Sequence, residues 1–308
     1  MANAFSRSWE IAKLSFNVMK HGKELLAFPI LAAVFSVIFI AVMLFPSIIF
    51  GLVSADTRYA GFAEYLILFL AYLGLSFIAT FFNVCVVYTV KKRFEGGNAT
   101  FKESINFAMS RANLIFVWSL VSATVGIILR IIDEMAERAG RSGQILLYIT
   151  RSILGMIWGI VAIFVIPGMV YYNLGPFDAI KKSVNVLKKT WGESLIRHYG
   201  LGLAQLIIIL IGSVFIVPLY MLISPLGIFW ALGVVALGVL YFIVVCLVFG
   251  IANQIFNTAL FVYADTGKIP QGFSKEIMNS AFQNKKTNFG QSGSIQQILN
   301  SLFIINSL

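Results

Sequence analysis

The hydrophobic positions of the chain form six long apolar runs, separated by short segments that carry most of the charge. A helix needs about 20 predominantly apolar residues to cross the hydrocarbon core of a bilayer, and each run is close to that length or longer. The predicted spans are Leu25–Val53, Ala63–Val90, Leu114–Ile132, Ile145–Tyr172, Leu201–Ile223 and Ile228–Phe249. The pattern predicts an all-α polytopic membrane protein, with its six transmembrane helices between residues 25 and 264.

The sixth apolar run continues to about Tyr263. As a single helix it would be about 50 Å long, whereas the hydrocarbon core is about 30 Å thick. We therefore expect this helix to tilt, to break near Gly250, or to project past the membrane surface.

Three polar segments precede the first, third and fifth spans, and each has apolar residues spaced three or four apart. This spacing places the apolar side chains on one face of a short helix. The faces are Phe5, Trp9, Ala12, Phe16 and Met19; Phe101, Ile105, Ala108 and Ala112; and Phe177, Ile180, Val184, Leu187 and Trp191. We predict amphipathic interfacial helices at 1–24, near 101–112 and at 176–191, each followed by a helical hairpin. Thr100 and Glu103 form a capping-box pattern at the second.

Composition supports a membrane protein and excludes a soluble one. Hydrophobic residues make up 59% of the chain and charged residues only 12%, against about 25% charged in soluble domains. The mean hydropathy is +0.89. Cys85 and Cys246 lie inside apolar runs and have no metal-binding spacing.

The net charge of +10 is unevenly distributed along the chain. Of the 23 Lys and Arg residues, 18 flank the spans on the side that holds both termini, and 4 lie on the other side. This bias predicts that both termini are cytoplasmic. The charge is thus explained by topology, and we expect no nucleic-acid partner.

The helix predicted at 176–191 carries four lysines. Lys181 and Lys188 flank its apolar stripe, whereas Lys182 and Lys189 lie on the opposite, polar side. Such a helix is typical of segments that lie in the membrane interface and bind anionic headgroups through lysine. Packing of the helix against the protein's own cytoplasmic face is the alternative.

The segment 265–308 is predicted to be a cytoplasmic tail. A polar linker over 284–293 is followed by Ile295, Ile298, Leu299, Leu302 and Ile305, which suggest a terminal amphipathic helix. We expect this tail to be separable from the bundle.

A few polar residues occur within the spans: Asn83, Gln205, Asn253, Asn257 and Arg151. Polar amides in membranes usually bond helix to helix, and a polar path is the alternative. Arg151 lies about 9 Å from the outer end of its helix, from where it can reach the interface or pair with Asp133, Glu134 or Glu137. Gly155 and Gly159 form a GxxxG pattern, which suits an internal helix contact or self-association.

The sequence contains no motif for metal-assisted, nucleotide-dependent or nucleophilic catalysis. We therefore expect no enzyme activity, no cofactor and no metal. The composition favours a membrane-organising or lipid-interacting protein, or an integral subunit of a complex; a transporter or lipid-translocating protein is the alternative.

Three blocks of sequence resemble an uncharacterised prokaryotic family of six-span membrane proteins. They are FSRSWEIAKLSFNVMKHGKELLAFP (5–29), FVIPGMVYYNLGPFDAIKKSVNVLKKTWGESL (164–195) and IFNTALFVYADTGKIPQGF (255–273). In layout alone, the chain is also similar to the membrane domains fused to some glycerophosphodiester phosphodiesterases. The chain has no hydrolase domain, so that activity does not carry over. The resemblance implies a prokaryotic cytoplasmic membrane.

Overall fold

The computed structural model describes residues 12–17, 19, 24–53, 60–191 and 200–273. These residues are helical apart from short turns, and none of them is in a strand. The helices are α2 (Glu24–Val53), α3 (Ala60–Phe94), α4 (Phe101–Met109), α5 (Ala112–Arg138), α6 (Arg141–Ala162), α7 (Val165–Tyr172), α8 (Pro176–Trp191), α9 (Gly200–Ile223) and α10 (Ile228–Thr266), with a 3-10 turn at Ser224–Leu226. The described chain contains six spans long and apolar enough to cross a membrane, which confirms the predicted fold class.

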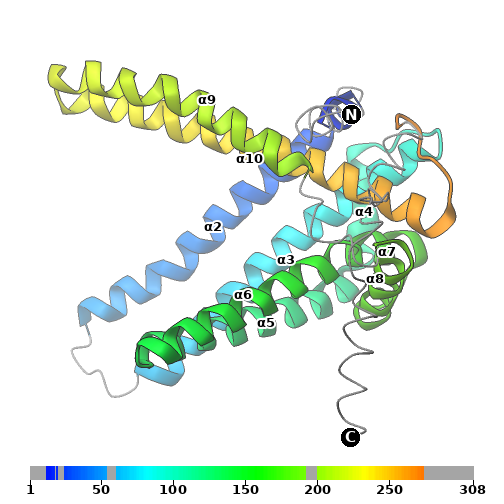
Figure 1. Ribbon diagram of the computed structural model, residues 1–308, viewed down its shortest axis with the longest axis horizontal. Helices are drawn as coiled ribbons and strands as arrows, with labels where there is room; N and C mark the ends of the chain where they lie inside the picture. The colour runs from blue at the N-terminus through cyan, green and yellow to red at the C-terminus, as the bar shows by residue number, and fades with distance from the viewer. Residues whose placement is uncertain (1–11, 18, 20–23, 54–59, 192–199, 274–308) are drawn as a thin grey trace, which may run out of the picture.

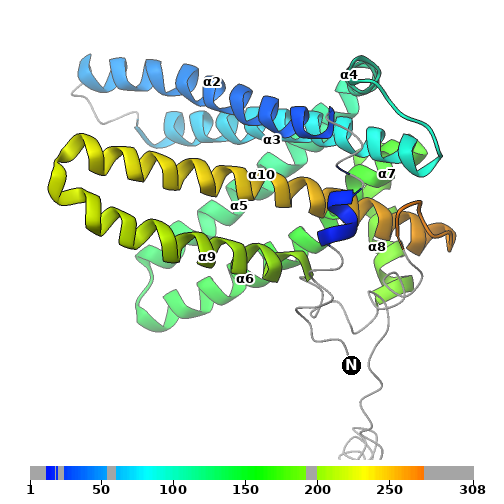
Figure 2. The same cartoon turned by 90° about the horizontal axis from the view of Figure 1, so that it is seen from above.

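The spans pair in the order that the sequence predicted. α2 packs on α3, α5 on α6, and α9 on α10, while α3 also packs along α5. Figure 1 shows these elements spreading from one end of the molecule as three arms, namely α2, the group of α3, α5 and α6, and the pair of α9 and α10. Seen from above, α2 runs alongside α3, in agreement with their packing (Figure 2).

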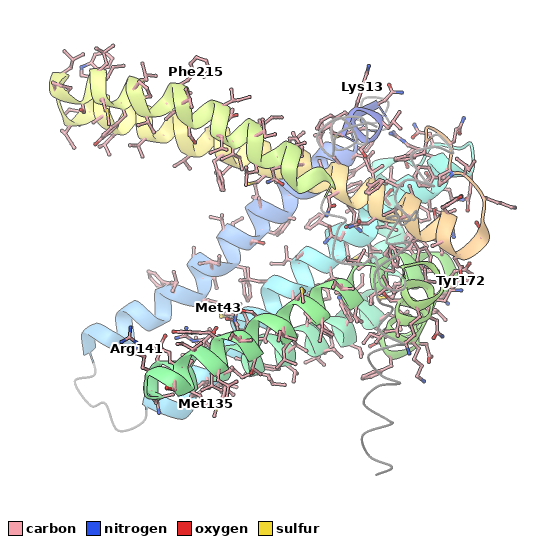
Figure 3. All side chains as sticks on the ribbon, viewed as in Figure 1. Lys13, Met43, Met135, Arg141, Tyr172 and Phe215 are labelled. Atoms are coloured by element: carbon pink, nitrogen blue, oxygen red, sulfur yellow. The ribbon has the colours of Figure 1, made fainter. Side chains whose placement is uncertain are left out.

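Buried side chains gather at the end where the arms meet. Phe28, Ile115, Phe164 and Phe261 are among the largest fully buried side chains. We call this end the head, which comprises residues 12–17, 24–28, 80–94, 101–115, 163–188 and 249–273. Beyond the head the spans expose most of their apolar side chains, as Phe215 does at 71% on α9 (Figure 3).

Two of the segments predicted to be interfacial helices pack into the head, and their contact with a membrane interface stays a prediction. In α4 the capping box is present, because Thr100 Oγ accepts from Glu103 N and the Glu103 carboxylate accepts from Thr100 N. Ser104 lies on the buried face and is 2.8 Å from Thr89 Oγ of α3. Near the N-terminus, Ala12 is buried and the Phe16 ring meets Phe249 edge to face at 5.5 Å. Phe5 and Trp9 lie outside the described residues.

The sixth predicted span is an unbroken helix. α10 passes Gly250 without interruption and ends at Thr266, where Gly267 adopts a left-handed conformation. Its second half, from Phe249 to Phe261, is mostly buried. Of the three predicted options, a break near Gly250 is wrong: the helix continues into the head and forms part of its core, and its tilt in a membrane stays a prediction.

The fourth predicted span, in contrast, is not a single helix. The regular helix is interrupted at Ile163 and Phe164, which separates α6 from α7: Ile163 N–H donates to Ile160 O, and Phe164 leaves helical geometry with φ −102° and ψ 3°. Pro167, in the first turn of α7, has no N–H to donate back across the break. The Val161 carbonyl accepts a hydrogen bond of 2.6 Å from Ser183 Oγ of α8. Thus a side chain from another helix satisfies a backbone group at the break.

The pair of α9 and α10 is held by close packing over a glycine. A Cβ added at Gly212 would lie 2.1 Å from the Tyr241 ring of α10. The Tyr241 hydroxyl also donates to the Ile208 carbonyl at 2.5 Å. The ring can lie this close to the α9 backbone only because residue 212 has no side chain.

Substituting Gly212 with leucine should therefore loosen this hairpin, since the Tyr241 ring must move and its hydrogen bond is lost. Overpacking of this kind costs about 1–3 kcal/mol. Cross-linking can measure this loosening. Gln205 Nε2 lies 3.7 Å from Cys246 Sγ, so the variant Gln205→Cys has two thiols that a short bifunctional reagent can bridge. Adding G212L to this variant should slow the cross-linking of the two thiols.

Gly233→Leu is the matched control, because a Cβ at Gly233 meets no atom within 4 Å. Both variants gain the same helix propensity. Equal cross-linking rates in G212L and G233L would show that the glycine contact does not hold the hairpin together.

Candidate functional site

Helix α8 has the bounds predicted for an interfacial helix, but its buried face only partly matches the predicted stripe. Pro176 begins the helix and Asp178 lies in its first turn, as expected. Leu187 of the stripe is buried, as are Ala179, Ser183 and Val186 beside it, whereas Phe177 is 62% exposed. α8 packs against α7, α6, α10 and α5. These contacts favour the alternative, in which α8 packs on the protein itself.

Small residues allow the first half of α8 to pack closely. A Cβ added at Gly168 of α7 would lie 3.7 Å from the Cβ of Ala179, so the two helices approach closely here. Ala179 and Ser183 leave room for this approach to α7 and α6. Phe177 therefore remains on the surface, where a membrane interface can receive it.

Lys182 does not stand free on the polar face of α8, and its expected exposure to water is wrong. Its Nζ lies 2.5 Å from Asp265 Oδ1 at the end of α10, with the two side chains only 30% and 13% exposed. The Tyr172 hydroxyl of α7 also donates to Asp265. Lys182 Nζ lies 4.6 Å from the centre of the Tyr172 ring. We call Tyr172, Lys182 and Asp265 the triad; it connects α7, α8 and α10. Figure 3 labels Tyr172.

The other three lysines of this helix differ from Lys182. Lys181 is 77% exposed and lies 3.6 Å from Asp178, itself exposed. Lys188 is also exposed. The side chain of Lys189 lies outside the described residues. Lys181 and Lys188 are therefore the lysines of α8 that a headgroup can reach.

The predicted boundary before Asp265 does not separate a tail from the bundle. Asp265 belongs to the triad, and α10 continues to Thr266. Phe273 is buried, with ring centroids 6.1 Å from Phe94 and 6.3 Å from Phe256. Residues 265–273 thus belong to the head. The expected linker and terminal helix lie outside the described residues.

The polar residues of the spans are not gathered into one site. Gln205 donates to Cys246 across the α9 and α10 hairpin. Asn83 and Asn257 are partly buried and Asn253 is exposed. Among the described residues, no hydrogen bond joins these four amides to one another. Gln205 thus bonds helix to helix, as expected for an amide in a span, and the described residues give the four amides no common lining for a path.

Arg151 pairs with one of the three acidic residues expected for it. Its Nε lies 3.2 Å from Asp133 of α5, and its side chain is 45% exposed. Glu134 interacts with Arg130 and Tyr65 and not with Arg151. Arg130 Nε lies 3.1 Å from one oxygen of the Glu134 carboxylate, and the Tyr65 hydroxyl donates to the other oxygen. The arms thus carry a polar cluster of Tyr65, Arg130 and Glu134 at the ends of α3 and α5.

The two glycines of the GxxxG pattern have different surroundings. A Cβ at Gly155 would meet only Leu129 of α5, at 3.9 Å, and a Cβ at Gly159 would meet no atom within 4 Å. The pattern is therefore not a close internal contact over both positions. Self-association through this face stays a prediction.

Tyr172, Asp265, Tyr65 and Arg130 were not anticipated as interacting residues. One feature of the sequence could have marked Asp265 as a candidate: it is the first acidic residue after a long apolar run. Its partners could not be inferred, because they come from helices far away in the chain. Among the described residues, no group of three His, Cys, Asp or Glu side chains could hold a metal ion.

Comparison with protein families finds one match. The model of a family of unknown function (DUF6159) matches residues 62–273, which cover most of the described chain and end at the buried Phe273. This agrees with the resemblance to an uncharacterised family. No curated protein and no solved structure matches the chain.

Proposed function

Because the chain belongs to a family of unknown function (DUF6159), we propose its role from its own residues: a non-enzymatic membrane protein that binds and organises lipid. The head supplies the folded core, and the arms supply a large surface to lipid. We place the protein in a prokaryotic cytoplasmic membrane, with the head and both termini on the cytoplasmic side.

The observation that carries this proposal is the separation of the core from the apolar surface. Buried side chains concentrate in the head, while the far halves of α9 and α10 expose Phe215, Leu222 and Phe229 at 71%, 76% and 86%. In water such a surface would be costly, at about 25 cal/mol per Å². In a bilayer, acyl chains cover it, and arms that diverge contact more lipid than a closed bundle does.

The charge of the head supports its orientation. Lys91, Lys92 and Arg93 end α3, and Lys181 and Lys188 lie on α8. A basic surface beside membrane spans favours the cytoplasmic, anionic leaflet. Phe177 and the exposed stems of these lysines suit contact with headgroups.

The alternative, a transporter or lipid-translocating protein, has weaker support. It requires a path lined by Asn83, Gln205 and Asn253, whereas Gln205 bonds to Cys246 and Asn253 lies on the surface. An integral subunit of a larger complex is compatible with the lipid role, since lipid and protein can both cover the arms.

The test of the proposal is retention of anionic lipid. The double variant K181Q/K188Q should bind phosphatidylglycerol about tenfold more weakly, because each lysine near an anionic surface contributes up to about 1 kcal/mol. The measurement is native mass spectrometry of the full chain, titrated with phosphatidylglycerol and with phosphatidylcholine.

The matched control is R138Q/R141Q, which removes the same charge from exposed arginines in the arms. The control should keep the preference for phosphatidylglycerol. If the wild-type protein binds both lipids equally, or if the two double variants lose affinity alike, the basic head is not an anionic-lipid surface.

A further inference from the structure

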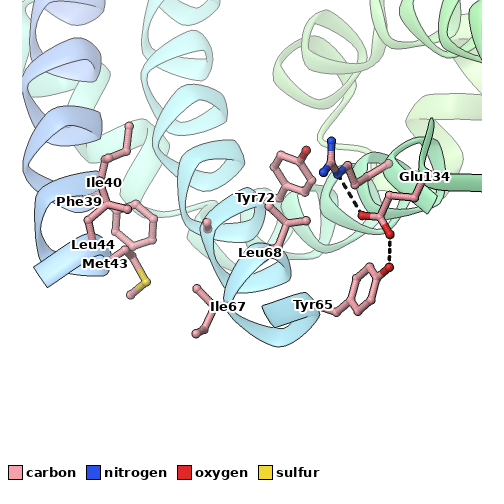
Figure 4. Close-up of a pocket in the computed structure, with 11 residues that line it drawn as sticks. Phe39, Ile40, Met43, Leu44, Tyr65, Ile67, Leu68, Tyr72 and Glu134 are labelled. Atoms are coloured by element: carbon pink, nitrogen blue, oxygen red, sulfur yellow. Dashed lines mark hydrogen bonds and ion pairs between the residues drawn. The ribbon is translucent and has the colours of Figure 1, made fainter. Parts of the chain in front are cut away.

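A cavity of about 380 Å³ lies among the arms, away from the head. Ile40, Met43 and Leu44 of α2 and Leu68 and Tyr72 of α3 contribute its walls, and Arg130 and Glu134 of α5 also line it (Figure 4). Its volume is within the range of about 300–1,000 Å³ that is usual for ligand pockets. An apolar wall with a few polar groups at one place is also usual for such pockets.

The polar part of the cavity contains N–H groups of Arg130 that make no hydrogen bond to any described residue. Each oxygen of the Glu134 carboxylate already accepts a hydrogen bond, one from Arg130 Nε and one from the Tyr65 hydroxyl. Figure 4 shows the Tyr65 hydroxyl pointing at this carboxylate. The two terminal nitrogens of the Arg130 guanidinium make no hydrogen bond to any described residue. A ligand here is therefore best matched if it presents acceptor oxygens.

The polar and apolar residues of the cavity are arranged to match the polar headgroup and the acyl chain of a lipid. Tyr65 lies near the start of α3 and Glu134 near the end of α5, and we place these ends at the level of the headgroup oxygens, with Leu68 and Tyr72 farther along α3. From Tyr65 to Tyr72, α3 rises about 10 Å. An acyl chain can follow this wall while its polar end remains beside Arg130.

We infer that this cavity binds one acyl chain whose carboxylate, ester or phosphate oxygens accept hydrogen bonds from Arg130. The inference rests on the proposed lipid-binding function and adds a defined site to it, at the end of the molecule opposite the basic head. A free fatty acid and a membrane phospholipid both carry this chemistry.

Photochemical cross-linking tests the site. The full chain, purified and reconstituted, is incubated with palmitate or with phosphatidylglycerol that carries a diazirine on the acyl chain. After irradiation, labelled peptides are mapped by mass spectrometry. Label concentrated on residues 39–44 and 67–72 supports the site, and the more efficient of the two probes identifies the source of the chain. Label spread evenly along all exposed arms overturns it.

Two variants sharpen the test. Ala71 lines the cavity, and A71F should fill it and reduce labelling of these peptides about tenfold or more. R130Q/E134Q removes the guanidinium without leaving an unpaired carboxylate, and should lower the probe's affinity about tenfold. R141Q is the control, since Arg141 is exposed and does not line the cavity.

Unchanged labelling in both A71F and R130Q/E134Q contradicts the site. That result does not affect the proposed anionic-lipid preference of the head, because Lys181 and Lys188 do not line the cavity. If A71F does not remain monodisperse, the charge-balanced variant and the wild-type label map decide the question.

Discussion

Substituting Phe261 with alanine should destabilise the protein by about 3–5 kcal/mol, as expected for a large aromatic removed from a packed core. Phe261 is 1% exposed in the second half of α10. Its ring centroid lies 5.6 Å from Phe164, 5.9 Å from Tyr171 and 6.2 Å from Tyr172. Alanine would leave a cavity among these rings, where α10 meets α7. Thermal and chemical unfolding of the purified protein in detergent measure the loss.

Phe242→Ala is the matched control, because Phe242 is on the same helix but 51% exposed on the arm. Lipid or detergent can fill the space left by its ring, so we expect a change below about 1 kcal/mol. Equal destabilisation by the two substitutions would mean that the head is not the stabilising core of the fold.

Substituting Asp265 with alanine should also destabilise the head strongly. The change leaves Lys182 partly buried without its anionic partner, and the Tyr172 hydroxyl without its acceptor. Breaking a fully buried pair costs about 3–5 kcal/mol, and the partial exposure of Lys182 reduces our expectation to about 2–3 kcal/mol. The same unfolding measurements apply.

Asp178→Ala serves as the comparison for this substitution. Asp178 also pairs with a lysine of α8, but both side chains are exposed, so its removal should change stability very little. The triad would lose its proposed role if D265A were as stable as D178A. A double variant with Lys182→Met should recover part of the loss, because it removes the unpaired charge.

The helices and their pairing could be predicted from the sequence because hydrophobic length and short connections determine them. The capping box at Thr100 and Glu103 is a local signal and was also predictable. The break at Ile163 was not, since it depends on Ser183 of another helix bonding to the Val161 carbonyl. Apolar residues continue through the break, so hydropathy alone shows one span.

The candidate residues were predicted less well, for a physical reason. Lys181 and Lys182 are neighbours of the same type, and only the approach of α10 to α8 separates an exposed lysine from one bound to Asp265. The buried face of α8 includes the small residues Ala179 and Ser183, which a search for large apolar side chains does not detect. Pairing of Arg151 with Asp133 was predictable because the two residues lie on either side of the short connection between α5 and α6.

The central claim is that this protein selects lipids at its surface. Electron spin resonance of spin-labelled lipids tests it most directly, with the full chain reconstituted in bilayers and the motionally restricted fraction measured for each headgroup. We predict a larger restricted fraction for labelled phosphatidylglycerol than for labelled phosphatidylcholine, at equal lipid-to-protein ratio. The preference should shrink as salt is raised, because screening weakens contact with exposed lysines. Equal restricted fractions for the two lipids at low salt would contradict the account.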